Sequence, residues 1–191
     1  MTIVITSGLF LLISILIIPI ICLSYLCIDN RSNVIMKGRK EVFWTGVFAF
    51  YICIIVSFTI LPIRVPGEIP YGFEYNLNVL NLLKAFTNRA ALISYCENIL
   101  LFMPVTIFGH LGNVHMVKSL KGSVLISFVM SIGIELIQGL EAILCIAEDM
   151  TPIMDVNDVI CNTIGGAIGY MLVRFCTDQH KNEVFDSFHS L

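Results

Sequence analysis

This chain has few charged residues. Only 13% of its 191 residues are charged, against about 25% in a soluble globular domain. The hydrophobic share is 57% and the mean hydropathy is +0.89, which leaves little material for a soluble domain. The 11 basic residues are dispersed rather than clustered, so nucleic acid is not an expected partner. The composition therefore predicts an integral membrane protein.

Signatures of common active sites are also missing. The seven cysteines contain no CxxC pair and no Cys/His spacing typical of a metal site, so we interpret them as reduced packing residues. No GxSxG, HExxH or Cys/His nucleophile pattern occurs. No ligand motif supports a metal ion and no cofactor is expected, although oxygen ligands of the kind that bind hard cations are present.

Five apolar runs dominate the chain, at about 3–28, 42–62, 90–110, 122–146 and 156–176. Each holds roughly 20 residues or more, which is enough for a helix to cross a hydrocarbon core of about 30 Å. We expect an all-α membrane protein, a bundle of about five transmembrane helices with a long outward loop between the second and third.

The expected organisation is two N-terminal transmembrane helices (1–62), an extracytoplasmic loop (63–89), a three-helix core (90–176) and a cytoplasmic tail (177–191). Its orientation follows from the basic residues. Eight of the 11 lie on the side of the tail, and the other three, Arg64, Lys84 and Arg89, lie in the long loop. The excess of Lys and Arg on cytoplasmic loops predicts an external N-terminus and a cytoplasmic C-terminus.

The long loop opens with prolines and glycines, which disfavour regular structure. Tyr71, Phe73 and Tyr75 suit a segment that lies at the level of the lipid headgroups. A loop of this length in a compact membrane domain is usually functional or mobile. We expect it to form a roof on the outer side of the bundle.

The last apolar run carries carboxylates and an amide at helical spacing. Asp155, Asp158 and Asn162 share a stripe with Gly165 and Gly169 at about 100° per residue. A charge inside a lipid-spanning helix costs about 2.5–3.5 kcal/mol, so these side chains should face protein or water and mark a functional site. Asp155 also suits a helix N-cap. The glycines suit close helix packing, within one chain or between chains.

With this orientation, polar residues of three runs fall in the same outer half of the membrane. They are expected to line an outward pocket under the loop, with Arg89 or Arg64 available to pair with a carboxylate or an anionic ligand. The predicted ligand-binding residues are Glu97, Asn98, Glu135, Gln138, Asp155, Asp158, Asn162 and Arg89. Glu135 and Asp158 are the candidates for acid or base. Gln138 equally suits a hydrogen-bonded tie between helices.

Four short motifs, in order, resemble the VanZ-like family. The segment 81–86 (Asn-Leu-Leu-Lys-Ala-Phe) is similar to its opening Asn-Leu-(Ile/Val)-Pro-Phe, and 98–104 (Asn-Ile-Leu-Leu-Phe-Met-Pro) to its Asn-x-x-x-Phe-x-Pro. Segment 135–138 is similar to its Glu-x-x-Gln, and 155–165 to its Asp-(Val/Ile)-x-Asp-x-x-x-Asn-x-x-Gly. Family members often carry an Arg shortly before the last motif, whereas this chain has no basic residue there.

The resemblance implies a bacterial plasma-membrane protein that contributes to resistance to glycopeptide and lipoglycopeptide antibiotics of the teicoplanin type. It does not imply a particular reaction. Three hypotheses remain open on these grounds. The protein binds a membrane lipid or a lipidated small molecule, or it is an intramembrane enzyme acting on an envelope lipid or cell-wall precursor, or it is a small transporter, against which the lack of an internal repeat argues. The oligomeric state is left open.

Overall fold

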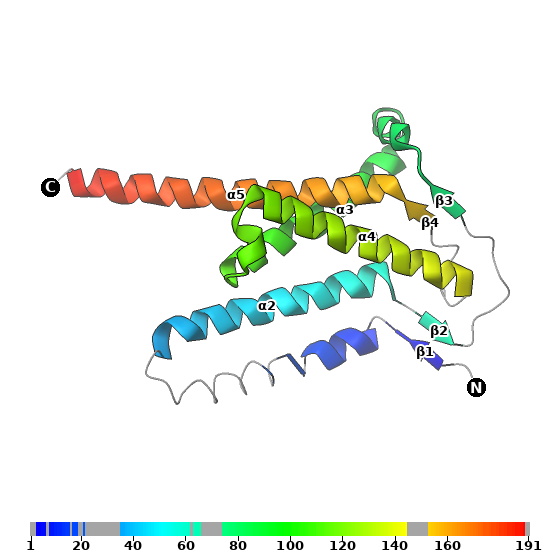
Figure 1. Ribbon diagram of the computed structural model, residues 1–191, viewed down its shortest axis with the longest axis horizontal. Helices are drawn as coiled ribbons and strands as arrows, with labels where there is room; N and C mark the ends of the chain where they lie inside the picture. Colours follow the sequence, from blue (N-terminus) through cyan, green and yellow to red (C-terminus); the bar gives the residue numbers. More distant parts are fainter. Residues whose placement is uncertain are drawn as a thin grey trace.

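The computed structural model describes residues 3–6, 8–15, 17–18, 21, 35–61, 63–65, 74–144 and 153–189. Four long helices run side by side along the molecule: α2 (Ile35–Thr59), α3 (Arg89–Leu111), α4 (Leu120–Leu144) and α5 (Val156–His189) (Figure 1). Two 3₁₀ helices accompany them, η1 (Val79–Phe86) before α3 and η2 (His115–Lys118) before α4. The expected helical class is confirmed.

Four segments are long and apolar enough to cross a membrane: Glu41–Thr59, Arg89–Leu111, Leu120–Leu144 and Val156–Asp178. They correspond to the last four of the five predicted runs, and they make the chain a multi-pass membrane protein. Of the first run, the described part is helical at 8–15 and the remainder is largely outside the described residues. The structure therefore has four candidate spans by length and composition, and the fifth stays a prediction.

Helix α5 packs against both α3 and α4 because its glycines remove the side chains that would keep the backbones apart. A Cβ atom on Gly165 or Gly169 would overlap the backbone of α3 at Ile99 or Met103. A Cβ atom on Gly166 would overlap the hydroxyl of Ser127 on α4. The glycine stripe thus serves packing within one chain, which settles the alternative left open by the sequence.

A small apolar core lies between α2, α3 and α4, where Ile55, Phe102, Val105 and Ile134 are buried together. The Tyr51 hydroxyl donates a hydrogen bond of 2.7 Å to a backbone carbonyl of α3 and fastens α2 beside it. Many large apolar side chains elsewhere are exposed, as expected for helices whose outer faces meet lipid.

Two short strand pairs lie at the end of the bundle where α2 and α4 finish and α5 begins (Figure 1). β1 (Ile3–Ile5) pairs antiparallel with β2 (Ile63–Val65), and β3 (Glu74–Asn76) pairs parallel with β4 (Ile153–Asp155). The loop expected to lack regular structure thus contains two strands and η1. Each strand is stabilised by a partner far away in sequence, which local composition does not reveal.

Candidate functional site

Asp155, the last residue of β4, holds the start of α5. Its Oδ1 accepts hydrogen bonds from the backbone N–H and the side-chain amide of Asn157, at 2.8 and 2.6 Å. Its Oδ2 accepts a third, of 2.9 Å, from the side-chain amide of Asn76. The expected N-cap role is confirmed. All three donors are neutral amides.

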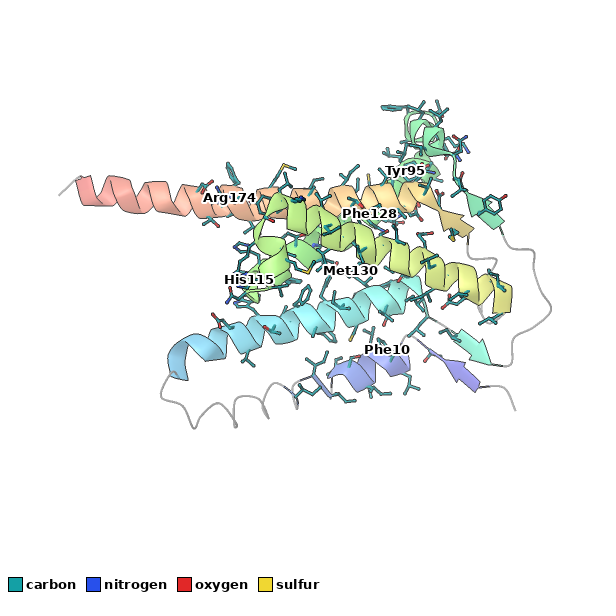
Figure 2. The ribbon with its side chains drawn as sticks, in the orientation of Figure 1. Phe10, Tyr95, His115, Phe128, Met130 and Arg174 are labelled. Carbon is teal, nitrogen blue, oxygen red and sulfur yellow. The ribbon has the colours of Figure 1, made fainter. Side chains whose placement is uncertain are left out.

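Further asparagines extend these contacts into an amide network, made of Asn76, Asn78, Asn81 and Asn157. Asn81 donates a hydrogen bond of 2.8 Å to the side-chain oxygen of Asn76, and Asn157 donates one of 3.2 Å to the carbonyl of Asn78. The Tyr95 hydroxyl of α3 donates to the carbonyl of Asn81 at 2.9 Å. Tyr95 lies at this end of the bundle, away from His115 and Arg174 (Figure 2). The network joins η1, α3 and α5.

Three carboxyl groups, Glu135, Asp155 and Asp158, gather beside this network and are called the acidic cluster below. Glu135 is only 5% exposed and its Oε2 accepts a hydrogen bond of 2.7 Å from the backbone N–H of Asp155. Asp155 and Asp158 are close enough to act on Glu135 electrostatically. The Asn98 side chain of α3 lies within hydrogen-bonding reach of Asp158. Residues from α3, α4 and α5 therefore meet in one place.

No cation balances this cluster within the part of the chain that the structure describes. The ion pair found there joins Arg174 to Asp178, both of which are exposed, at a separation of 3.5 Å and toward the other end of α5. Arg89 is exposed at the first position of α3, and the side chain of Arg64 lies outside the described residues. Nor do the described residues include a group of three or more His, Cys, Asp or Glu side chains arranged to hold a metal ion.

One turn deeper, a second polar layer continues between α4 and α5. The Asn162 amide donates a hydrogen bond of 2.8 Å to the Ser131 hydroxyl. Helix α4 places a polar side chain at every fourth residue toward this interface, and all of them are buried: Ser123, Ser127, Ser131 and Glu135. This serine ridge was missed in the sequence because serine hardly changes hydropathy, although its spacing of four is visible there.

Several buried polar atoms in these layers lack a hydrogen-bond partner. They include the side-chain oxygens of Asn157 and Asn162, which are 0% and 4% exposed. Both amides use their nitrogen as a donor, toward Asp155 and Ser131 respectively. A buried acceptor without a partner costs about 1–3 kcal/mol, so the site has unused accepting capacity.

Other predicted site residues are placed elsewhere. The Gln138 amide donates a hydrogen bond of 2.8 Å to the carbonyl of Thr59, so it ties α4 to the end of α2. Glu97 is exposed on α3, one position from Asn98. The structure thus brings together Asn98, Glu135, Asp155 and Asp158, with Asn162 one turn below, and leaves Glu97, Gln138 and Arg89 apart from them.

The exposed surface of η1 is mostly apolar, with Lys84 as its one charged residue. Leu80, Leu83 and Phe86 are 70%, 60% and 87% exposed, whereas Asn81 of the same helix belongs to the amide network. The expected headgroup-level residues Tyr71 and Phe73 lie outside the described residues. η1 ends just before the membrane-spanning part of α3 begins at Arg89, so it lies where a span meets the membrane surface.

Four apolar helices with a hydrogen-bonded polar end define a helical multi-pass membrane protein. The sequence pattern of the VanZ/LLP1 family matches residues 48–177, more than half of the 191-residue chain, and the chain belongs to this family. The match runs from α2 into α5 and contains the whole acidic cluster. It confirms the resemblance seen in the motifs. No curated protein and no solved structure matches the chain.

Proposed function

We propose that this protein binds a lipid-anchored ligand at the outer face of the bacterial plasma membrane and thereby contributes to resistance to teicoplanin-type glycopeptides and lipoglycopeptides. The acidic cluster, with Asn98 and Asn162, contacts the polar head of the ligand. Apolar surface beside it holds the acyl chain.

The observation that carries the proposal is the two-sided character of η1. One side shares hydrogen bonds with the asparagines around Asp155, and the other exposes Leu80, Leu83 and Phe86. A molecule with an acyl chain and a polar head meets both kinds of surface at this end of the bundle. A ligand without an apolar part would use only one of them.

The proposal includes a membrane orientation. Its support is the uneven division of Lys and Arg, with eight of 11 on the side of the C-terminal tail. In this orientation, a fifth span within the first apolar run places the N-terminus outside. The acidic cluster then lies near the outer leaflet, where a lipid-anchored molecule arrives.

Equilibrium binding of lipidated and delipidated teicoplanin to the purified full chain in nanodiscs tests the proposal. We expect binding of the lipidated form to be at least about tenfold tighter, because each buried CH₂ of the acyl chain contributes about 0.8 kcal/mol. Empty nanodiscs correct for partition into lipid. Equal and negligible binding of both forms would contradict the proposal.

Two isosteric variants test whether the acidic cluster takes part. Glu135→Gln and Asp158→Asn keep the size of each side chain and remove its charge, so binding of lipidated teicoplanin should weaken about tenfold. Asp178→Asn is the matched control, because Asp178 is exposed and pairs with Arg174 toward the far end of α5. If all three variants bind like the unaltered protein, the cluster is not the binding site.

A second candidate function is an intramembrane enzyme that modifies an envelope lipid or cell-wall precursor. The specific observation in its favour is the proximity of Glu135 to Asp158, since two carboxyl groups can divide the roles of acid and base. An enzyme that uses Asp158 in this way would lose most of its turnover in Asp158→Asn while still binding the substrate. Mass spectrometry of envelope lipids from cells with and without the protein would show the product.

A further inference from the structure

We propose that the ligand carries a protonated amine, and that this ammonium group docks on the acidic cluster among Glu135, Asp155 and Asp158. The inference rests on the proposed function and adds the chemical class of the ligand head.

The acidic cluster has no positive partner among the described residues. Three carboxyl groups from two helices and a strand lie within electrostatic reach of one another. The described part of the chain supplies no cation to them, and the donors that hold Asp155 are uncharged amides. Glu135 is buried and Asp155 and Asp158 are partly buried, and buried carboxylates are normally paired with a positive group. A ligand ammonium supplies that charge from outside the chain.

Two buried amide oxygens at or next to the cluster also lack hydrogen-bond partners. The Asn157 side chain reaches the cluster through its amide nitrogen, which donates to Asp155, while its own oxygen has no partner. Asn162 is one helical turn from Asp158, and its Ser131 partner is one turn from Glu135. Asn162 therefore lies in the layer next to the cluster, and its oxygen has no partner. Both side chains are more than nine-tenths buried. Each needs a donor.

The hydrogen-bonding groups of an ammonium match this set of acceptors. A primary ammonium offers three N–H donors and no acceptor. The site already holds more acceptors than donors, so the addition of donors satisfies it. A phosphate or a free carboxylate would add acceptors and negative charge to the acidic cluster. None of the basic side chains that the structure describes pairs with this cluster. The geometry therefore favours an amine over an anionic head.

Lipid competition on the purified full chain tests the inference. The chain is equilibrated with equal amounts of phosphatidylethanolamine, N-acetylated phosphatidylethanolamine and phosphatidylglycerol, and the retained lipid is identified by native mass spectrometry. We expect retention of phosphatidylethanolamine to exceed that of the N-acetylated form about tenfold, because acetylation removes the charge and two N–H donors. Millimolar ethanolamine in a separate arm shows whether the amine binds without its lipid.

Variants connect the preference to the site. Glu135→Gln and Asp158→Asn should each abolish most of the preference for the free amine, and Asp178→Asn should leave it unchanged. Circular dichroism and size-exclusion profiles identify any variant that fails to fold, and the other one then carries the test. Loss of the preference in Asp178→Asn as well would overturn the assignment.

The outcomes separate this inference from the proposed function. Equal retention of the free and acetylated amines, with lipidated teicoplanin still bound, overturns the ammonium inference and leaves the binding function standing. Retention of no lipid and no binding of lipidated teicoplanin overturns both. Preferred retention of phosphatidylglycerol also overturns the inference, since it shows an anionic head in the site.

Discussion

The side-chain oxygen Oε2 of Glu135 and the backbone N–H of Asp155 are joined by a hydrogen bond of 2.7 Å across 20 residues of sequence. This bond fixes the last part of β4 against α4 just before α5 begins. It also means that Glu135 has a structural contact in addition to any ligand, so its two roles must be separated by choice of variant.

Glu135→Leu and Glu135→Gln separate these roles. Leucine removes the acceptor and leaves the Asp155 N–H unpaired, so we expect a loss of about 1–3 kcal/mol in the free energy of unfolding. Glutamine keeps an acceptor oxygen at the same reach, so its loss should stay below about 1 kcal/mol. Thermal or denaturant unfolding in the same detergent measures both. Equal destabilisation by the two variants would show that the charge, rather than the hydrogen bond, stabilises the fold.

Gly165→Ala should destabilise the bundle because the new Cβ would overlap the α3 backbone at Ile99. We expect a cost of about 1–3 kcal/mol, which is typical of overpacking. Gly133→Ala is the control, because a Cβ there meets nothing within 4 Å and alanine favours the helix by up to about 1 kcal/mol. Unfolding midpoints compare the two. A neutral Gly165→Ala would contradict the close contact between α3 and α5.

Gln138→Leu removes the tie between α4 and the Thr59 carbonyl with little change in volume. Hydrogen bonds between membrane helices contribute about 0.6 kcal/mol on average and at most about 1.7, so a small loss of unfolding free energy in that range is expected. Hydrogen exchange at the end of α2 should increase at the same time. If exchange there is unchanged, Gln138 acts elsewhere, and its predicted part in ligand binding regains support.

Tyr95→Phe should loosen η1, since it removes the O–H that donates to the Asn81 carbonyl at 2.9 Å. We expect faster amide exchange across residues 79–86, with the midpoint of global unfolding lowered by only a few degrees. Tyr170→Phe is the matched control, because Tyr170 lies in the middle of α5 and not beside η1. Unchanged exchange in η1 would show that the other contacts of the amide network are enough to hold it.

Cysteine labelling tests the orientation. In a cysteine-free background, Lys84→Cys on η1 should react with a membrane-impermeant maleimide in intact cells, because this residue is exposed at the end where α5 begins. His115→Cys on η2 should react only after permeabilisation. The reverse pattern would place the acidic cluster on the cytoplasmic side and remove the basis for an external ligand.

Much of this fold follows from apolar run length alone. The run predicted to begin at 156 coincides with the first residue of α5, and the run expected at 122–146 overlaps nearly all of α4. Hydropathy identifies these helices because the membrane requires one continuous apolar segment for each span. The glycines of α5 likewise indicated close packing, although only the structure shows that their partners are α3 and α4.

The site was predictable only in part. Helical spacing placed Asp155, Asp158 and Asn162 on one stripe, and depth placed Glu135 and Asn98 near them. Spacing within one helix could not show that Gln138 donates a hydrogen bond to the end of α2. This contact depends on how the helices are arranged around one another. The contact of Asn76 with Asp155 depends on β3 pairing with β4, a partnership across 79 residues. No local pattern encodes such a pairing.

The glycine contacts of α5 have a mechanical consequence. With no side chains between them at Gly165 and Gly169, the backbones of α3 and α5 lie in direct contact, and we expect the two helices to move as one unit. We therefore expect any opening that admits the proposed ligand head to involve the parts beside this helix pair, namely η1 and the end of α2 at Thr59. The proposed ligand head would then reach the acidic cluster from the side, past η1, rather than along the axis of the bundle.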